Sequence, residues 1–179
     1  MLDADQTAPA LAVENIHKSF GSVEVLKGVS LSARDQDVIA ILGSSGSGKS
    51  TFLRCINMLE MPDQGSVAIK GETIAMTHGK GGRACADPKQ LERLRARLSM
   101  VFQQFNLWGH MNVLQNVMEA PVHVLKQDKK TARAKAEAML EKVGLSAKLD
   151  AFPAQLSGGQ QQRVAICLLY TSDAADEED

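Results

Sequence analysis

The chain has 179 residues, of which 44% are hydrophobic and 23% charged, and its formal net charge is -1. This length suits one domain with a sizeable core and excludes two independent enzymes, while the charge balance argues against a nucleic-acid partner. The three cysteines have no metal-ligand spacing and favour a reduced, cytosolic setting. No run is apolar for long enough to predict a membrane span, and the acidic start "MLDADQTAPA" does not resemble a signal peptide.

The first part of the chain carries strand patterns and then a helix pattern. Residues 11–20 and 23–33 alternate apolar and polar side chains, which predicts half-buried strands. Residues 37–42, "DVIAIL", are nearly all apolar and predict a strand buried on both faces of a sheet. A glycine-rich turn follows, and a helix is expected over about residues 49–59.

The middle of the chain mixes short elements before it becomes helical. Residues 65–74 predict a hairpin region, and the glycine-rich residues 78–88 predict a flexible surface loop without a phosphate role. An amphipathic helix is expected over 88–98, with proline at its first position, and a strand over 98–103. Residues 112–144 have a helical pattern that ends at a glycine. Together these patterns predict an α/β fold with a helical subdomain.

A phosphate-binding loop is predicted between the apolar strand and the first helix. The stretch "GSSGSGKST" satisfies the pattern G-x-x-x-x-G-K-[ST]. Its glycines allow backbone N–H groups to converge on phosphate oxygens, Lys49 would reach the β and γ phosphates, and the Ser50 hydroxyl would ligate Mg²⁺. The plainer alternative is a tight glycine turn. The candidate nucleotide-binding residues are Gly43, Ser44, Ser45, Gly46, Ser47, Gly48, Lys49, Ser50 and Thr51.

A second motif, "LSGGQ" at residues 156–160, follows that loop at domain-scale distance, and "VFQQFNLW" lies between the two. With these three stretches in this order, the chain resembles the ATP-binding subunit of ABC transporters. The resemblance implies ATP and Mg²⁺ as cofactors, and an α/β P-loop NTPase (RecA-like) core. That core would carry an N-terminal antiparallel β region and an inserted helical subdomain, and would be incomplete at the C-terminus.

The resemblance also assigns roles to individual residues. Ser157, Gly158, Gly159 and Gln160 would cover the γ-phosphate held by the opposing subunit of a dimer, although a capped helix with a glycine entry explains the same residues. Gln103 matches the glutamine that reaches Mg²⁺ and the attacking water; alone, it reads as a surface residue at a strand end. Phe20 matches the aromatic residue that stacks on adenine, with a core phenylalanine as the alternative.

The stretch from Phe105 to Leu125 resembles the subfamily that energises the uptake of polar amino acids. This similarity implies an ATPase on the cytoplasmic face of the inner membrane. Its expected partners are a second ATP-binding subunit, transmembrane permease subunits and, indirectly, a periplasmic amino-acid-binding protein. The alternative is an adaptor of the same family that binds ATP without turnover and without transport. Expected segments are 11–104 for the first part of the core, 105–160 for the helical subdomain, 161–166 for the continuing helix and 167–179 for a tail.

Two further groups of side chains each have two interpretations. The first group either lines a groove for a membrane subunit or belongs to the helical core. The second is a solvated helix face, with lipid contact as the alternative. The first comprises Phe105, Leu107, Trp108 and Met111, and the second Lys126, Lys129, Lys130, Arg133 and Lys135.

The sequence departs from the family after "LSGGQQQRVAI". The family continues to an apolar strand ending in Asp-Glu, which binds Mg²⁺ and activates water, and then to a histidine that contacts the γ-phosphate. Asp173 has no adjacent glutamate, and all four histidines precede the signature. Residues 167–179 are therefore expected to be foreign sequence, with a shortened paralogue as the alternative. We expect the chain as written to lack ATP turnover, to be poorly stable and to aggregate.

Overall fold

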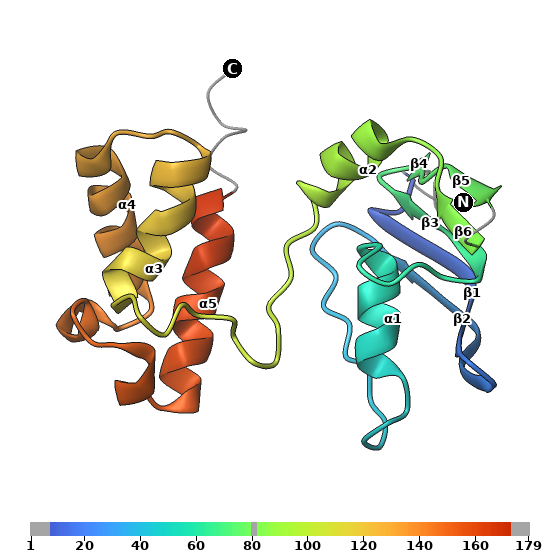
Figure 1. The fold of residues 1–179 in the computed structure, drawn as a ribbon, viewed down its shortest axis with the longest axis horizontal. Coiled ribbons are helices and arrows are strands. Elements are labelled where there is room, and N and C mark those ends of the chain that lie inside the picture. Colours follow the sequence, from blue (N-terminus) through green and yellow to red (C-terminus); the bar gives the residue numbers. More distant parts are fainter. Residues whose placement is uncertain (1–7, 80–81, 173–179) are drawn as a thin grey trace, which may run out of the picture. The chain divides into compact units, whose positions relative to one another are not determined.

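The computed structural model describes residues 8–79 and 82–172, and its internal contacts divide the chain into two compact units (Figure 1). Unit 1 is Met1–Leu98 and unit 2 is Ser99–Asp179. Unit 1 contains the strands and two helices, and the helices of unit 2 follow. The domain boundaries expected from the sequence stay predictions.

The predicted N-terminal strands of unit 1 are confirmed and form an antiparallel sheet with two strands from the middle of the chain. Val13 lies opposite both Leu31 and Val67, so the central strand brings apolar residues of its neighbours to one face. The strand order is β2-β1-β3-β4. The strands are β1 (Leu11–Phe20), β2 (Val23–Ala33), β3 (Gln64–Ile69) and β4 (Glu72–Thr73).

Helix α1 (Lys49–Ile56) supplies the other side of the unit 1 core. Phe52 and Cys55 are three residues apart on this helix and are both buried, in the same cluster as Val13 and Ile16 of β1. Residues at i and i+3 share one face of a helix, which explains why α1 packs on the sheet with these two side chains. The helix expected near residues 49–59 is confirmed, with its end at Ile56.

The strand expected over residues 37–42 is wrong. In the structure this stretch is irregular and lies between β2 and α1, with Val38 98% and Leu42 91% exposed (Figure 1). A strand exists only through hydrogen bonds to its neighbours, and none of the described strands pairs with this stretch. The apolar pattern alone therefore did not produce a strand here.

The flexible loop expected over residues 78–88 contains a two-stranded antiparallel sheet instead. Strands β5 (Met76–Gly79) and β6 (Gly82–Cys85) pair with His78 opposite Arg83. The glycine-rich composition of the stretch concealed this pairing, because glycine and lysine have low strand propensity.

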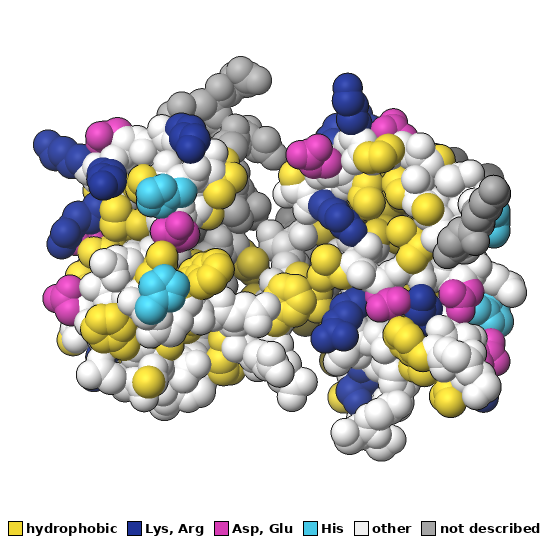
Figure 2. All heavy atoms as spheres, viewed as in Figure 1, with side chains coloured by type: hydrophobic (Ala, Val, Ile, Leu, Met, Phe, Trp, Pro, Cys, Tyr) yellow, Lys and Arg dark blue, Asp and Glu magenta, His cyan; other side chains and the backbone are white. Residues whose placement is uncertain are grey.

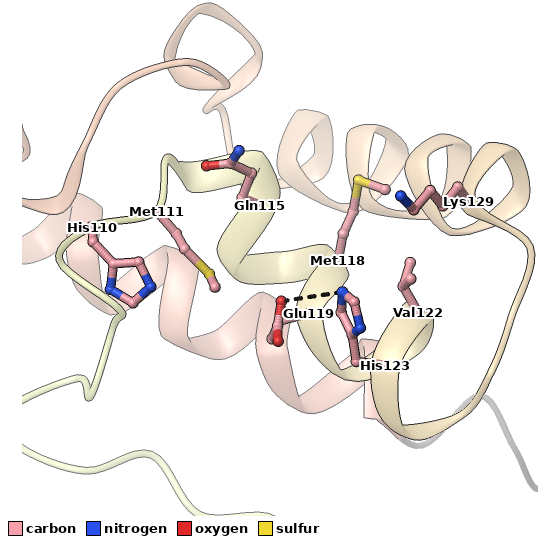
Figure 3. A pocket seen from close by; sticks show the side chains of 8 residues that line it. All are labelled: His110, Met111, Gln115, Met118, Glu119, Val122, His123 and Lys129. Carbon is pink, nitrogen blue, oxygen red and sulfur yellow. Dashed lines mark ion pairs between the residues drawn. The ribbon is translucent and has the colours of Figure 1, made fainter.

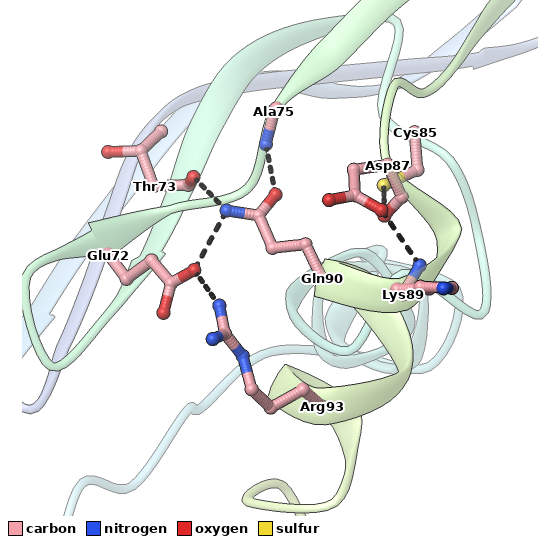
Figure 4. A network of polar contacts seen from close by, with 8 residues as sticks. All are labelled: Glu72, Thr73, Ala75, Cys85, Asp87, Lys89, Gln90 and Arg93. Atoms are coloured by element: carbon pink, nitrogen blue, oxygen red, sulfur yellow. Dashed lines mark hydrogen bonds and ion pairs between the residues drawn. The ribbon is translucent and has the colours of Figure 1, made fainter.

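Helix α2 (Pro88–Arg95) is confirmed, with Pro88 at its first position and the Asp87 side chain accepting from Lys89 N. Its face toward β4 carries a polar network (Figure 4). Gln90 donates to Glu72 Oε1 at 3.0 Å and accepts from Ala75 N, and the Arg93 guanidinium also pairs with Glu72. This network joins the helix to the end of the sheet.

Unit 2 is a small helical bundle. Its buried cluster draws on three helices and includes Val113, Leu140 and Val164, each at 0% exposure. The helical pattern expected over 112–144 is confirmed, and Gly144 ends it with a φ of 71°. The strand expected over 98–103 is wrong, because these residues have no regular secondary structure. The long helices are α3 (Val113–Glu119), α4 (Lys129–Lys142) and α5 (Gly158–Ser172), and a π-helical turn spans Ala120–Val124.

A buried amide fixes the loop that precedes α3. Asn116 is 2% exposed, and its Nδ2 donates to the carbonyls of Trp108, Met111 and Asn112 at 2.9–3.1 Å. Its Oδ1 accepts from Trp108 N at 2.7 Å. One side chain therefore contacts four backbone groups, its two Nδ2 hydrogens being shared among three carbonyls, and holds the loop in one shape.

Candidate nucleotide-binding site

The loop before α1 is shaped by glycines with positive φ. Gly46 and Gly48 have φ values of 80° and 90°, a region that residues with a side chain rarely adopt. Gly48 also packs closely on β2, since an added Cβ would lie 3.0 Å from Val25 Cγ1 and 3.2 Å from the Val25 carbonyl oxygen. Position 48 therefore requires glycine both for its backbone conformation and for the close approach of β2.

Lys49 places its ammonium inside this loop. Its Nζ donates to the carbonyl oxygens of Gly43 at 2.8 Å and Ser44 at 2.7 Å, and to Ser47 Oγ at 3.3 Å. The loop residues from 43 to 47 are exposed, so the charge sits beneath a ring of backbone that faces solvent.

The first turn of α1 adds to the positive potential of the loop. This turn contains no acidic residue, and Gly48 at the N-cap offers no side-chain oxygen to its N–H groups. The first N–H groups of a helix have no acceptor within the helix and carry the positive end of its dipole. With the Lys49 ammonium, they form a site that suits an anion such as a phosphate chain.

Phe20 ends β1 and is 48% exposed, so the structure does not place it in the core. The Lys18 ammonium lies over its ring, 5.2 Å from the centroid. The phosphate loop, α1 and Phe20 all belong to unit 1. An exposed aromatic ring in the same unit as a phosphate loop offers a stacking surface for a base.

The signature residues begin α5 in unit 2 with a reciprocal cap. Gln160 N donates to Ser157 Oγ at 3.3 Å, and Ser157 N donates to Gln160 Oε1 at 2.9 Å. Gly158 and Gly159 differ from the glycines of the phosphate loop. Neither has a positive φ, and a Cβ added to either would meet no described heavy atom within 4 Å. The packing of this chain therefore does not require glycine at these two positions.

Gln103 lies in an exposed turn of unit 2. The turn is closed by Phe105 N donating to the Phe102 carbonyl at 3.0 Å, and Phe105 and Asn106 have φ values of 59° and 53°. Two consecutive non-glycine residues in the left-handed region are uncommon. The structure thus distributes the candidate residues over both units, with the phosphate loop and Phe20 in one and Gln103 and the signature in the other.

A cavity in unit 2 was not expected from the sequence. It has a volume of about 450 Å³ and is lined mainly by α3 and the π-helical turn (Figure 3). His123 Nε2 lies 3.8 Å from Glu119 Oε2 on its wall. Glu119 and His123 are four residues apart, which places them on one face of a helix, and this spacing was the signal that the sequence offered. Its lining residues are His110, Met111, Gln115, Met118, Glu119, Val122, His123 and Lys129.

The two ambiguous groups of side chains now have defined surroundings. Leu107 packs on the buried cluster of unit 2, Met111 lines the cavity, and Trp108 is 58% exposed. The first group is therefore divided between core and surface. The basic residues of the second group are exposed, and those of α4 line one edge of unit 2 (Figure 2). Arg133 pairs with Glu137 at 2.7 Å.

The cysteines and the acidic residues do not form a metal centre in the part of the chain that the structure describes. Cys55 and Cys85 are free thiols. Burial raises the pKa of the Cys55 and Cys167 thiols from 9.0 to about 11, so both are neutral near pH 7. Within residues 8–79 and 82–172, none of the helices has the length and apolarity of a membrane span.

Comparison with known proteins agrees with these features. The family model described as ABC transporter matches residues 26–175. Octopine permease ATP-binding protein P of Rhizobium radiobacter is 62% identical over 159 residues, which is 88% of this chain and 61% of that protein. The arginine/ornithine transport ATP-binding protein of Pseudomonas aeruginosa is 60% identical over 157 residues, or 87% of this chain and 62% of that protein.

A solved structure shows the same fold. It is a dimeric ATP-binding cassette in a post-hydrolysis state, bound to ADP and Pi, and it matches with a TM-score of 0.73 and 32% identity. The match covers 91% of this chain and 70% of that one. The P-loop NTPase fold expected from the sequence is thereby confirmed. The chain spans about three fifths of the length of its curated relatives, and it belongs to the ABC transporter family.

Proposed function

We propose that this chain is the nucleotide-binding part of an ABC-type importer subunit that couples ATP hydrolysis to the uptake of polar amino acids. The observation that carries the proposal is the Lys49 ammonium at the start of α1, held in an exposed loop of backbone that suits phosphate. Relatives named for octopine and for arginine and ornithine transport favour an importer over an adaptor that has no role in transport.

In this proposal, unit 1 binds the nucleotide. The N–H groups of residues 43–51 and the Lys49 ammonium bind the β and γ phosphates, and Phe20 stacks on the adenine. Ser50 is exposed in the first turn of α1, where its hydroxyl fits Mg²⁺ bound to the phosphates. Gln103 is proposed as the residue that reaches this ion and the attacking water.

Unit 2 would act on the nucleotide of a second ATP-binding subunit. The cap formed by Ser157 and Gln160 fixes the start of α5, whose N–H groups favour a phosphate. Because the chain's own packing does not require Gly158 and Gly159, their lack of side chains is best explained by the close approach of an outside group. This supports a dimer, the homodimer being the simplest form, in which each signature covers the partner's γ-phosphate.

The cavity of unit 2 is the proposed contact with the transmembrane permease subunits (Figure 3). It combines the apolar Met111 and Met118 with the polar Glu119 and His123, and the exposed Trp108 lies in the adjoining loop. A hollow that combines apolar and polar side chains can accept a short amphipathic helix of a partner. The subunit would then be peripheral on the cytoplasmic face of the inner membrane, with a periplasmic amino-acid-binding protein as an indirect partner.

Equilibrium binding of Mg·ATP to the chain tests the nucleotide site. Lys49→Ala should weaken binding by at least about tenfold, because a charge-assisted contact to phosphate contributes roughly 1.5–3 kcal/mol. Lys27→Ala removes an exposed lysine of the same unit and should leave the affinity unchanged. Equal affinity of the parent chain and the Lys49 variant would contradict the proposed site.

Steady-state phosphate release tests the proposed division between binding and turnover. The chain alone should bind ATP without measurable turnover, because water activation in the family depends on an Asp-Glu strand that follows the signature. A version extended with that strand should hydrolyse ATP. Comparable turnover by the two forms would remove the role given to those carboxylates.

A further inference from the structure

Lys18 is a buried lysine in the strand that ends at Phe20. It is 9% exposed, and lysine is rarely this buried unless its charge is paired. Its ammonium donates to the Met61 carbonyl at 2.8 Å and pairs with Glu60 Oε1 at 2.7 Å, and Asp63 Oδ1 lies 3.8 Å away. Three oxygens around one ammonium hold that charge in a single position.

All of these partners lie in the segment that follows α1. Glu60 to Asp63 follow α1, which starts at Lys49 and ends at Ile56, and Asp63 is also tied to the β1 backbone. Asp63 N donates to the His17 carbonyl at 2.8 Å, and Ser19 N donates to Asp63 Oδ2 at 2.6 Å. The residues on both sides of Lys18 thus bind the same segment.

The two ends of α1 are therefore fixed to one hairpin. At its start, Gly48 packs against Val25 of β2, just after the turn that joins β1 and β2. Beyond its end, Glu60 and Asp63 hold Lys18 and Ser19 of β1. These contacts thus fix the position of α1, which begins at the phosphate loop, relative to the strand that carries Phe20.

The Lys18 ammonium also lies over the Phe20 ring, 5.2 Å from its centroid. Residues i and i+2 of a strand point to the same side, which allows this cation–π contact. The ring is still 48% exposed and therefore keeps a surface on which a base can stack. A ring that is already held in place loses less conformational freedom when a ligand binds.

We propose that Lys18 is a positioning residue for nucleobase recognition: anchored by Glu60, Met61 and Asp63, it holds Phe20 in register with the phosphate loop through α1. The proposal rests on the nucleotide site proposed above. Lys18 does not touch the nucleotide, and its effect passes through the Phe20 ring. It therefore affects the base-dependent part of the affinity and leaves the phosphate-dependent part unchanged.

The test compares Mg·ATP with Mg·tripolyphosphate, which has the phosphates but no base, by calorimetry on the full chain. Lys18→Met keeps the apolar stem and removes the ammonium. We expect it to weaken ATP binding by roughly three- to tenfold, the size of a cation–π contact, and to change tripolyphosphate binding by less than about twofold. Lys27→Met, at an exposed site of the same unit, is the matched control and should change neither affinity.

A double-mutant cycle separates positioning from general damage. Phe20→Leu should weaken ATP binding, and Lys18→Met should have no further effect in the Phe20→Leu background, because the lysine acts through the ring. Additive losses of ATP affinity, or equal losses for ATP and tripolyphosphate, would overturn the role of Lys18. A parent chain that binds neither ligand would instead overturn the nucleotide site itself, and the proposal with it.

A second pair of variants applies if Lys18→Met does not fold. Lys18→Arg keeps the charge and should retain most of the preference for ATP over tripolyphosphate. Glu60→Gln leaves the lysine in place but removes its shortest ion pair, and should lower that preference by about twofold. An unchanged preference in folded Glu60→Gln, together with loss of preference in Lys18→Arg, would contradict the anchoring described here.

Discussion

The two units cover their apolar residues in different ways. In unit 2, the helices enclose a cluster whose central members, such as Val117 and Leu140, are fully buried. In unit 1, the sheet and α1 also bury a core, yet Val38 and Leu42 of the same unit are almost fully exposed. Helices satisfy their own backbone hydrogen bonds, whereas a strand depends on neighbours. An apolar segment therefore forms a strand only where neighbouring strands supply its backbone hydrogen bonds.

This difference matters for function because the phosphate loop belongs to unit 1, which leaves more of its apolar residues exposed. The exposed stretch that includes Val38 and Leu42 leads directly into Gly43, and the loop continues into α1. Its far end is anchored by the packing of Gly48, at the start of α1, on Val25 of β2. The position of the phosphate loop then depends on α1 and on the packing of Gly48 at its start.

The largest expected effect is the difference in unfolding free energy between two Leu→Ala substitutions, one in each unit. Leu140→Ala removes a side chain at 0% exposure in the unit 2 core, and we expect it to cost about 3 kcal/mol of unfolding free energy. Leu42→Ala makes the same chemical change at 91% exposure in unit 1 and should cost less than about 0.5 kcal/mol. Hydrogen exchange of the amides in each unit, with denaturant, measures both.

Similar costs of unfolding free energy at the two leucines would contradict the difference in burial between the units. A cost at Leu42 near that at Leu140 would mean that residues 37–42 are buried in solution. A small cost at both positions would mean that the helical cluster of unit 2 is loosely packed. Either result would replace the contrast drawn between the units.

The next effect concerns the buried amide of unit 2. Asn116→Ala removes the side-chain partner of the Trp108 N–H and of the Met111 carbonyl, whereas the Asn112 and Trp108 carbonyls keep the backbone donors Asn116 N and Met111 N. We expect a loss of about 2 kcal/mol. Thermal unfolding followed by circular dichroism measures this change. Gln162→Ala, at an exposed position of α5, is the control and should be within about 0.5 kcal/mol of the parent. A parent-like Asn116 variant would show that water replaces the amide.

Features set by local chemistry could be predicted from the sequence. The phosphate loop and the start of α1 follow from the glycine and lysine pattern, and Pro88 marks the start of α2 because its missing N–H costs nothing there. Gly144 ends the α4 region because it adopts positive φ without strain. Each of these depends only on residues within a few positions along the chain.

Features set by distant partners could not be predicted. The strand expected at 37–42 failed for lack of neighbours, and the β5–β6 pair was missed because its composition is poor in strand formers. Pro121 lies in the π-helical turn, where Leu125 N bonds to the Ala120 carbonyl five residues back. This widened turn shifts the helical register and helps to form the cavity, and no spacing rule in the sequence reveals it.

A smaller effect should appear at alkaline pH in both units. Burial raises the pKa of Cys55 in unit 1 and of Cys167 in unit 2 from 9.0 to about 11. The unfolded chain therefore ionises first, so the stability from each neutral thiol is present below pH 9 and is lost as pH rises to 11. We expect a loss on the order of 1 kcal/mol per thiol by pH 10.

Single alanine substitutions show how much of the stability lost at alkaline pH comes from the thiol of each unit. Cys55→Ala should remove the thiol contribution to the pH dependence of unit 1, and Cys167→Ala that of unit 2, as measured by denaturant unfolding at pH 8 and pH 10. Cys85 is half-buried, so Cys85→Ala serves as the control and should keep both contributions. Unaltered pH dependence in both buried-site variants would show that the thiols are already solvated in the folded chain.

The smallest change in stability is expected for exposed apolar residues of the stretch 37–42. Substitution of the same residues should have the largest effect on aggregation. Val38→Ser combined with Leu42→Ser should change the unfolding free energy by less than about 0.5 kcal/mol, because both side chains are exposed. The same change should raise the soluble fraction on expression, because adjacent exposed apolar residues promote association. Val124→Ser, at a 71% exposed site of unit 2, removes an apolar residue outside that stretch and should help less. Equal gains in solubility from the two variants would mean that aggregation does not begin in the stretch before the phosphate loop. The difference in burial between the units would then not extend to their behaviour in solution.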